Sequence, residues 1–165
     1  MTHRTTADWQ ALSQAHHLAP FTDYRDLNQR GARVITRAEG VYLWDSEGNK
    51  ILDGMAGLWC VNVGYGRQEL INAATQQMQQ LPYYNLFFQT VHPPAVELAE
   101  AIASVAPKGM DHVFFTGSGS EANYTVVRMV RHYWQVLGQP EKSVIIGRWN
   151  GYHGSSMGSG SLGGM

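Results

Sequence analysis

The sequence has few charged residues, a single cysteine and no long apolar run, and each of these scarcities excludes a class of protein. Only 15% of its 165 residues are charged, whereas about a quarter are charged in typical globular proteins. The formal net charge is -1, so nothing in the charge balance predicts attraction to nucleic acid or to an anionic membrane. We therefore expect small molecules or other proteins as partners.

Cys60 is the only cysteine, so no intramolecular disulfide can form, and this usage is typical of a reducing cytoplasm. We interpret Cys60 as a small buried hydrophobe rather than a reactive thiol. The opening residues MTHRTTADWQ lack the apolar centre of a signal peptide, and no run of about 18 apolar residues follows anywhere. The sequence thus predicts a protein that is neither secreted nor membrane-spanning.

Apolar, aromatic and glycine residues take the place of the missing charge. Hydrophobic residues make up 44% of the chain and aromatic residues 11%, and there are 18 glycines. This is enough apolar material for one sizeable core. The glycines and aromatics together indicate loops of close backbone approach, aromatic pocket walls and a large subunit interface.

The first third of the sequence predicts a short helix, a small sheet and a loop. Thr5 and Asp8 have the spacing of a helix-capping pair, which favours a leading helix. Residues 33–53 contain short alternating runs that are split by two turn signals, and this predicts a three-stranded meander. Residues 54–66 place four glycines around Trp59, a pattern typical of an irregular loop.

The remaining residues alternate between helical and strand-like patterns. Apolar residues recur at steps of three and four over 71–81 and 95–106, which predicts two amphipathic helices. A short strand over 111–115, a helix over 122–137 and a buried strand over 143–147 follow. Helix, strand, helix, strand indicates an α/β fold with a mostly parallel sheet.

The end of the sequence does not complete such a fold. The last twelve residues, GSSMGSGSLGGM, include five glycines and four serines, and that composition is typical of a flexible linker. Two strands do not close a parallel sheet. We therefore expect this stretch to be part of a longer chain.

The strongest local signal is the glycine–serine turn in TGSGSEAN, which separates the first predicted strand from the next helix. Unsatisfied N–H groups at a helix start, the helix dipole and serine hydroxyls together fit a phosphate monoester. A second interpretation stays open, because Ser118 and Glu121 also have the spacing of a capping box. A P-loop is excluded because no lysine follows the turn, and a strict three-glycine dinucleotide fingerprint is excluded because Ala122 stands where its third glycine would be.

A second signal, RWNGYHG, follows the second predicted strand. The carboxyl ends of strands in an α/β sheet meet at the ligand crevice, so Tyr152 is expected close to whatever the glycine–serine turn holds. Its ring could stack on a flat heteroaromatic ligand. Taken alone, however, a Tyr–His pair in a loop more often packs or faces solvent.

Together these segments resemble the class III aminotransferases. TGSGSEAN, RMVRHYW, GRWNGYHGSS and SLGGM, with GVYLWDSEGNKILDGMAGLWCVNVGYG upstream, are similar in order and spacing over essentially the whole chain. The likeness is closest to omega-amino acid or diamine:pyruvate transaminases. It implies the α/β fold type I of pyridoxal-phosphate-dependent transferases. Residues 1–60 would then contribute the β-meander to the small domain and the active-site entrance, and residues 61–165 would begin the large cofactor-binding domain and its mostly parallel sheet.

The resemblance also implies the roles of individual residues. The turn formed by Ser118, Gly119 and Ser120 binds the phosphate of pyridoxal 5'-phosphate, and Tyr152 stacks on the pyridine ring. His153 belongs to the same motif, and we expect it to have a positional rather than a proton-transfer role. No metal site is implied.

A substrate pocket is implied as well, lined by Trp59 and Phe87 with Phe21 beside them. Tyr124 is a departure from the family pattern, because relatives usually carry an acidic residue there. Losing that charge from the first helical turn costs at most about 1 kcal/mol, so we interpret Tyr124 as tuning rather than loss of function. The neighbouring aromatics are expected in the core or at a dimer interface: Tyr83, Tyr84 and Phe88.

The implied activity is transfer of an amino group from an omega-amine, diamine or β-amino acid to pyruvate in a cytoplasmic homodimer or larger homo-oligomer. The catalytic lysine of the family is expected beyond residue 165, because Lys50, Lys108 and Lys142 do not match it. This stretch alone is therefore expected to be inactive. Three alternatives stay open: a 4-aminobutyrate or ornithine transaminase, an aminomutase, or a stand-alone module that binds a phosphorylated ligand without catalysis.

Overall fold

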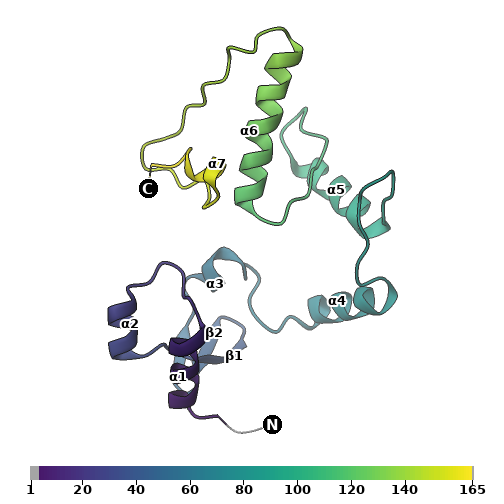
Figure 1. Cartoon of the computed structure of the whole chain (residues 1–165). Coiled ribbons are helices and arrows are strands. Elements are labelled where there is room, and N and C mark those ends of the chain that lie inside the picture. The colour runs from purple at the N-terminus through teal and green to yellow at the C-terminus, as the bar shows by residue number, and fades with distance from the viewer. Residues whose placement is uncertain (1–3, 165) are drawn as a thin grey trace. The chain divides into compact units, whose positions relative to one another are not determined.

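The computed structural model describes residues 4–164. The chain divides into two compact units, of which the first ends at Tyr84 and the second begins at Asn85, and Figure 1 shows the elements of each. The sequence-based boundary after residue 60 concerns the domains of the whole protein and stays a prediction.

Two short helices open the first unit, α1 (Thr6–His16) and α2 (Tyr24–Arg30). The predicted cap of α1 is confirmed, because the Thr5 hydroxyl accepts the Asp8 N–H while the Asp8 carboxylate accepts the Thr5 N–H at 2.8 Å. Helix α2 was not predicted. Its start is fixed by Asp23, whose carboxylate accepts backbone N–H groups of the first turn.

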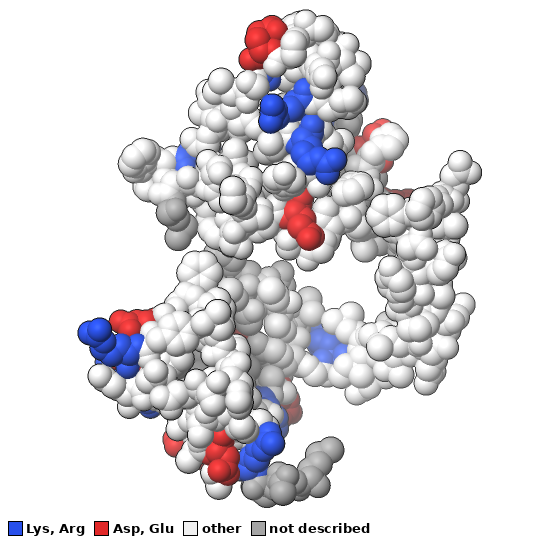
Figure 2. Space-filling model, viewed as in Figure 1, with Lys and Arg blue, Asp and Glu red and all other residues white. Residues whose placement is uncertain are grey.

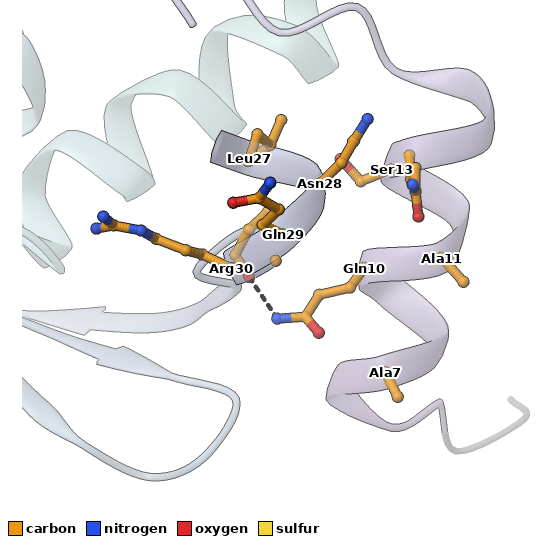
Figure 3. Close-up of a pocket in the computed structure, with 11 residues that line it drawn as sticks. Ala7, Gln10, Ala11, Ser13, Leu27, Asn28, Gln29 and Arg30 are labelled. Carbon is orange, nitrogen blue, oxygen red and sulfur yellow. Dashed lines mark hydrogen bonds between the residues drawn. The ribbon is translucent and has the colours of Figure 1, made fainter. Parts of the chain in front are cut away.

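A cavity of about 300 Å³ lies between these two helices. Figure 3 shows Gln10 reaching from α1 toward the end of α2, where its side-chain amide donates to the Ala32 carbonyl at 2.9 Å. Gly31 ends α2 with a φ of 76°, and a Cβ there would lie 2.5 Å from the Gln10 amide nitrogen. A side chain at position 31 would therefore displace the end of the Gln10 side chain, and the positive φ of this residue also favours glycine.

The predicted meander is confirmed as an antiparallel sheet of β1 (Ile35–Glu39), β2 (Tyr42–Asp45) and β3 (Lys50–Leu52), in that order. The Asp45 carboxylate closes the turn from β2 to β3, since it accepts the backbone N–H groups of Glu47 and Asn49. Both interstrand turns fall at the glycine-containing breaks seen in the sequence.

Four more helices follow the sheet beyond a short turn, α3 (Ala56–Trp59). Three of them confirm the predicted amphipathic helices: α4 (Gln68–Gln80) in the first unit, and α5 (Pro93–Val105) and α6 (Gly119–Val136) in the second. The fourth, α7 (Met157–Gly160), lies beside the N-terminal end of α6 in Figure 1. This packing joins the last part of the chain to the start of α6.

Two predicted strands are absent from the described part of the chain. Residues 111–115 and 143–147 have no regular secondary structure. A strand needs a neighbour to bond its N–H and C=O groups, and neither segment pairs in a ladder with any described residue. Both segments are non-helical, as their apolar pattern indicates, but no partner strand is present among the described residues to complete them.

The linker prediction for the last residues is wrong. The segment folds back through α7, and the Gly164 N–H donates to the Gly151 carbonyl at 3.1 Å. Gly147 lies so close to the Leu162 carbonyl that any side chain at position 147 would collide with it. Glycine here serves close backbone approach rather than flexibility.

The predicted core is not formed by the described residues, in which no hydrophobic residue is buried. Among them, only Asp45, at 9% exposed, and Ser159, fully enclosed, are buried. Cys60 is exposed, which corrects its interpretation as a buried hydrophobe. Figure 2 shows a surface that is mostly neither acidic nor basic. No helix within the described residues is both long and apolar enough to span a membrane.

Candidate functional site

The first turn of α6 leaves two backbone amides without an acceptor. Ser118 is the N-cap, and its hydroxyl accepts the Glu121 N–H at 3.2 Å. Within residues 4–164, no acceptor bonds the N–H groups of Gly119 or Ser120. The helix start thus presents two donors at the positive end of an 18-residue helix, and that is a ready seat for an anion.

Of the two hydrogen bonds of a capping box, this turn forms only the one in which the Ser118 hydroxyl accepts the Glu121 N–H. Glu121 makes no return bond to the Ser118 N–H; its carboxylate lies beside Gly117 instead, where a Cβ would be 2.7 Å from it. The Ser118 cap bonds the N–H of Glu121, the third residue of the helix, and leaves the N–H groups of Gly119 and Ser120 available to a ligand. The cap and the anion seat coexist in this turn.

Two hydrogen bonds tie the loop that carries Tyr152 to the start of α6. The Ser155 N–H donates to the Ser120 hydroxyl at 3.0 Å, and the Asn123 side-chain amide donates to the His153 carbonyl at 2.7 Å. Tyr152, 60% exposed, is the residue next to this junction. The structure therefore brings the sequence-predicted turn and the sequence-predicted tyrosine loop into direct contact.

Gly154 permits this junction. Its φ is +126°, and a Cβ at this position would lie 2.5 Å from the Ser120 hydroxyl and would also collide with the Ser159 hydroxyl. Ser159 is fully buried and bonds to the Ser156 hydroxyl at 2.8 Å. The tight approach of loop, α6 and α7 thus depends on a position without a side chain.

Two residues that make the junction, Asn123 and Gly154, were not among the sequence-predicted site residues. Asn123 entered only as the last residue of the TGSGSEAN segment. The available signal was an asparagine just after the glycine–serine turn, in the first turns of the helix. Its side-chain amide can bond a neighbouring loop. His153 contributes its backbone carbonyl to the junction, and its ring lies against Gly151.

A second cavity, of about 500 Å³, lies beside this turn in the second unit. Tyr124, the departure from the family pattern, forms part of its wall, and its ring packs against Gly158 of α7. The tyrosine therefore contacts the short helix α7. The residues lining the cavity are Phe114, Phe115, Thr116, Glu121, Tyr124, Thr125, Ser156, Met157 and Gly158.

The three predicted pocket aromatics are divided between the two units of the chain. Trp59 and Phe21 belong to the first unit, and no ring contact joins them in the described residues. Phe87 belongs to the second unit, where its ring lies 6.1 Å from that of Phe88. All of these rings are exposed, so their pocket roles stay predictions.

Trp59 ends an unpredicted turn inside the predicted loop, α3 (Ala56–Trp59). Before the turn, the Asp53 carboxylate accepts hydrogen bonds from the Tyr65 hydroxyl and from backbone N–H groups of the loop. The bond from Tyr65, followed by the backbone bonds, holds the pKa of Asp53 below its usual range. The same bond raises the pKa of Tyr65.

Two of the three lysines lie against aromatic rings. The Lys50 ammonium is 3.8 Å from the Tyr42 ring centroid, and the Lys142 ammonium is 3.7 Å from that of Trp134. These cation–π contacts give both lysines a packing role.

A family model for class-III aminotransferases matches residues 25–165. The chain belongs to the class-III aminotransferases. Pyridoxal phosphate is the cofactor of this family.

Two curated class-III relatives come from Pseudomonas aeruginosa. The putrescine–pyruvate aminotransferase is 74% identical over 165 residues, which cover 100% of this chain and 36% of the relative. The β-alanine–pyruvate aminotransferase is 44% identical over 154 residues, which cover 93% of this chain and 34% of the relative. The chain thus spans about a third of the length of these relatives.

Solved omega-transaminase structures share the fold of this class-III chain. An (S)-enantioselective enzyme from Thermomicrobium roseum is 43% identical with a TM-score of 0.94, covering 99% of this chain and 36% of that one. The Pseudomonas jessenii enzyme in complex with PMP is 44% identical with a TM-score of 0.91, covering 94% and 34%.

A third solved structure is that of an engineered variant. It is a thermostable omega-transaminase variant engineered for asymmetric synthesis of enantiopure bulky amines. It is 42% identical with a TM-score of 0.92, covering 95% of this chain and 35% of that one. Its changes include a tryptophan and a phenylalanine that lie 28 positions apart.

Proposed function

We propose that the protein containing this stretch is a pyridoxal-phosphate-dependent aminotransferase that moves an amino group from an omega-amine, diamine or β-amino acid to pyruvate. Membership of the class-III family and the likeness to pyruvate-dependent relatives support this assignment. The observation that carries it is the junction between the amide-bearing turn of α6 and the Tyr152 loop.

The first turn of α6 fits a phosphate monoester without a cationic side chain. Gly119 and Ser120 offer free N–H groups, and the positive end of the helix dipole favours the anion. The Ser118 and Ser120 hydroxyls each accept a backbone N–H, so each keeps its own hydrogen to donate. These three residues would hold the phosphate of the cofactor.

Tyr152 would cover the pyridine ring. Its loop is bonded to the same turn at His153 and Ser155, and its exposed ring is free to stack on a flat ligand. Bound pyridoxal phosphate supplies the electron sink for chemistry at the carbon next to the amine. The residues of this stretch bind, orient and cover it.

Trp59 and Phe87 would line the amine pocket. They lie 28 positions apart, the same separation as the tryptophan and phenylalanine changed in the variant engineered for bulky amines. That agreement supports a role for both side chains in the choice of amine. Phe21 stays a prediction for the same pocket, on the resemblance alone.

A homodimer or larger homo-oligomer would be the working form, and it would use part of the exposed aromatic surface. The cytoplasm stays the proposed compartment, from the single cysteine.

The test uses the full-length protein, stripped of cofactor and titrated with pyridoxal phosphate. We expect one cofactor per subunit, seen as a new visible absorbance band, and turnover of putrescine or β-alanine with pyruvate as the preferred acceptor. Absence of cofactor binding would reject the proposal. Preference for 2-oxoglutarate would assign the protein to the 4-aminobutyrate or ornithine group instead.

A further inference from the structure

Both ends of the loop over residues 54–64 rest on one turn of the small sheet. The Asp53 N–H donates to the Val41 carbonyl at 2.9 Å, and this bond fixes the residue that precedes the loop. The Tyr65 N–H donates to the Gly40 carbonyl at 2.7 Å, and the Gly40 N–H donates back to the Tyr65 carbonyl at 3.1 Å. The loop is therefore closed at its base by two adjacent residues between β1 and β2.

Inside this closed loop, α3 follows a left-handed path. Ala56, Leu58 and Trp59 have φ values of 47°, 63° and 66°, although each carries a Cβ that disfavours the left-handed region. Such residues, gathered in one short turn, persist only where the surroundings hold them. The turn that ends in Trp59 therefore needs an anchor.

The Asp53 carboxylate supplies that anchor. One oxygen accepts the Tyr65 hydroxyl at 2.7 Å and the Gly57 N–H at 2.8 Å, and the other accepts the Met55 N–H at 3.2 Å. It thus bonds amides before and within the left-handed turn as well as the far end of the loop. An ionised carboxylate suits this place because it only accepts hydrogen bonds.

Trp59 has no comparable support of its own. Its side chain is 79% exposed, and within the described residues it makes no ring contact. Within residues 4–164, the direction of the indole is therefore set by the backbone of α3 rather than by ring packing. Whatever holds the backbone of α3 also holds the indole.

We propose that Asp53 is the positioning residue for amine selectivity, acting through the left-handed turn that presents Trp59. The inference rests on the proposed function, since it takes Trp59 as a wall of the amine pocket. Asp53 itself touches neither substrate nor cofactor. Its effect is on which amines fit, and the chemistry of the cofactor seat is left unchanged.

The chain offers a matched control in Asp45. This carboxylate also closes a turn by accepting backbone N–H groups, those of Glu47 and Asn49, but its turn carries no pocket residue. Asp53→Ala and Asp45→Ala therefore remove the same kind of anchor from two different turns. Tyr65→Phe removes a single bond to Asp53 and is expected to have a smaller effect in the same direction as Asp53→Ala.

The first measurement does not depend on activity. In the full-length protein, amide hydrogen exchange over residues 55–61 should rise in Asp53→Ala and stay at the wild-type rate in Asp45→Ala. Residues 46–49 should show the opposite pattern. Unchanged exchange over 55–61 in Asp53→Ala would overturn the proposal even if the enzyme is an active transaminase.

The second measurement is the ratio of kcat/KM for 1-phenylethylamine to that for putrescine, with pyruvate as acceptor. We expect Asp53→Ala to change this ratio about tenfold or more, the range over which pocket shape discriminates substrates, while kcat with putrescine is kept. Asp45→Ala should leave the ratio unchanged. An equal loss for both amines in Asp53→Ala would show a merely structural role and overturn the inference, whereas a wild-type enzyme inactive on every amine would refute the proposed function.

Discussion

At the scale of single residues, Gly154 decides whether the Tyr152 loop can reach the start of α6. A methyl group at this position would meet the hydroxyls of Ser120 and Ser159. The positive φ of the residue adds a backbone cost for any side chain.

We predict that Gly154→Ala in the full-length protein weakens pyridoxal phosphate binding about tenfold or more. The added methyl group would push the Tyr152 loop away from α6 and break its hydrogen bonds to Ser120 and Asn123, each of which contributes about 1 kcal/mol. A cofactor titration followed by absorbance measures this. Gly109→Ala is the matched control, since Gly109 has a φ of +89° but no neighbouring atom within 4 Å of the point that a methyl group would occupy. Equal cofactor affinity in both variants would contradict the prediction.

Asp45 gives a pH-dependent prediction at the same scale. Hydrogen bonds from the Asn49 side chain and then from backbone N–H groups hold the pKa of the Asp45 carboxyl below its usual range. The folded state therefore binds fewer protons than the unfolded state at acid pH, so the stabilisation is complete above the unfolded pKa and is lost as pH falls through the folded one. We expect Asp45→Ala to lower the Tm of the full-length protein at pH 7 and to differ less from wild type at pH 3. A difference in Tm that stays constant with pH would contradict this.

The sequence predicted single residues best where their effect is local. The caps at Thr5 and Ser118 were found because a cap and its partner lie three positions apart. Asn123 was missed because its partner, the His153 carbonyl, is 30 residues away. No local pattern records such a bond.

At the scale of elements, α6 has two roles at one end. Its first two amides stay free for an anion, while the side chains of Ser120 and Asn123 bond the Tyr152 loop. The phosphate seat and the ring-covering loop are thereby fixed to the same rigid element. Such an arrangement positions both the phosphate and the ring of a cofactor.

We predict that Asn123→Ala weakens cofactor binding about fivefold, since a neutral hydrogen bond contributes about 1 kcal/mol. The measurement is again a titration of the stripped full-length protein. Asn72→Ala is the control, because the side chain of Asn72, as far as residues 4–164 show, only accepts an exposed bond from Gln68 within α4. Should the two variants bind the cofactor alike, the Asn123 bond does not support the loop.

Elements were predictable from sequence in proportion to how local their bonds are. The helices and the meander bond to themselves or to the next strand, so α4, α5, α6 and the three strands follow from periodicity and turn signals. Residues 111–115 and 143–147 would need distant neighbours to become strands. The left-handed α3 was not predictable because its anchor is a side chain outside the turn.

At the scale of the whole molecule, the apolar surface has no cover among the described residues. Large side chains such as Phe88 and Ile146 are 93% exposed, and the chain spans about a third of its curated relatives. The unfinished parallel sheet had predicted a longer chain. Composition showed enough apolar material for a core but not where its packing partners lie.

We predict that residues 1–165 expressed alone bind the dye ANS strongly and show no sharp thermal transition, whereas the full-length protein unfolds cooperatively. The physical reason is that burial of apolar surface, the main favourable contribution to folding, is missing from this stretch. Dye fluorescence and calorimetry test it. A cooperative, monomeric 165-residue fragment would instead favour the stand-alone binding module.

The closure of residues 54–64 on Gly40 and Val41 has a consequence for how such enzymes can diversify. A segment whose two ends meet at neighbouring points of a sheet can be exchanged as a cassette, because its length and contents do not strain the scaffold that receives it. Residues 54–64 could be grafted from one homologue into another with Asp53 and Tyr65 retained. The graft should transfer the first enzyme's preference among amines and leave the cofactor-binding residues of the second enzyme unchanged.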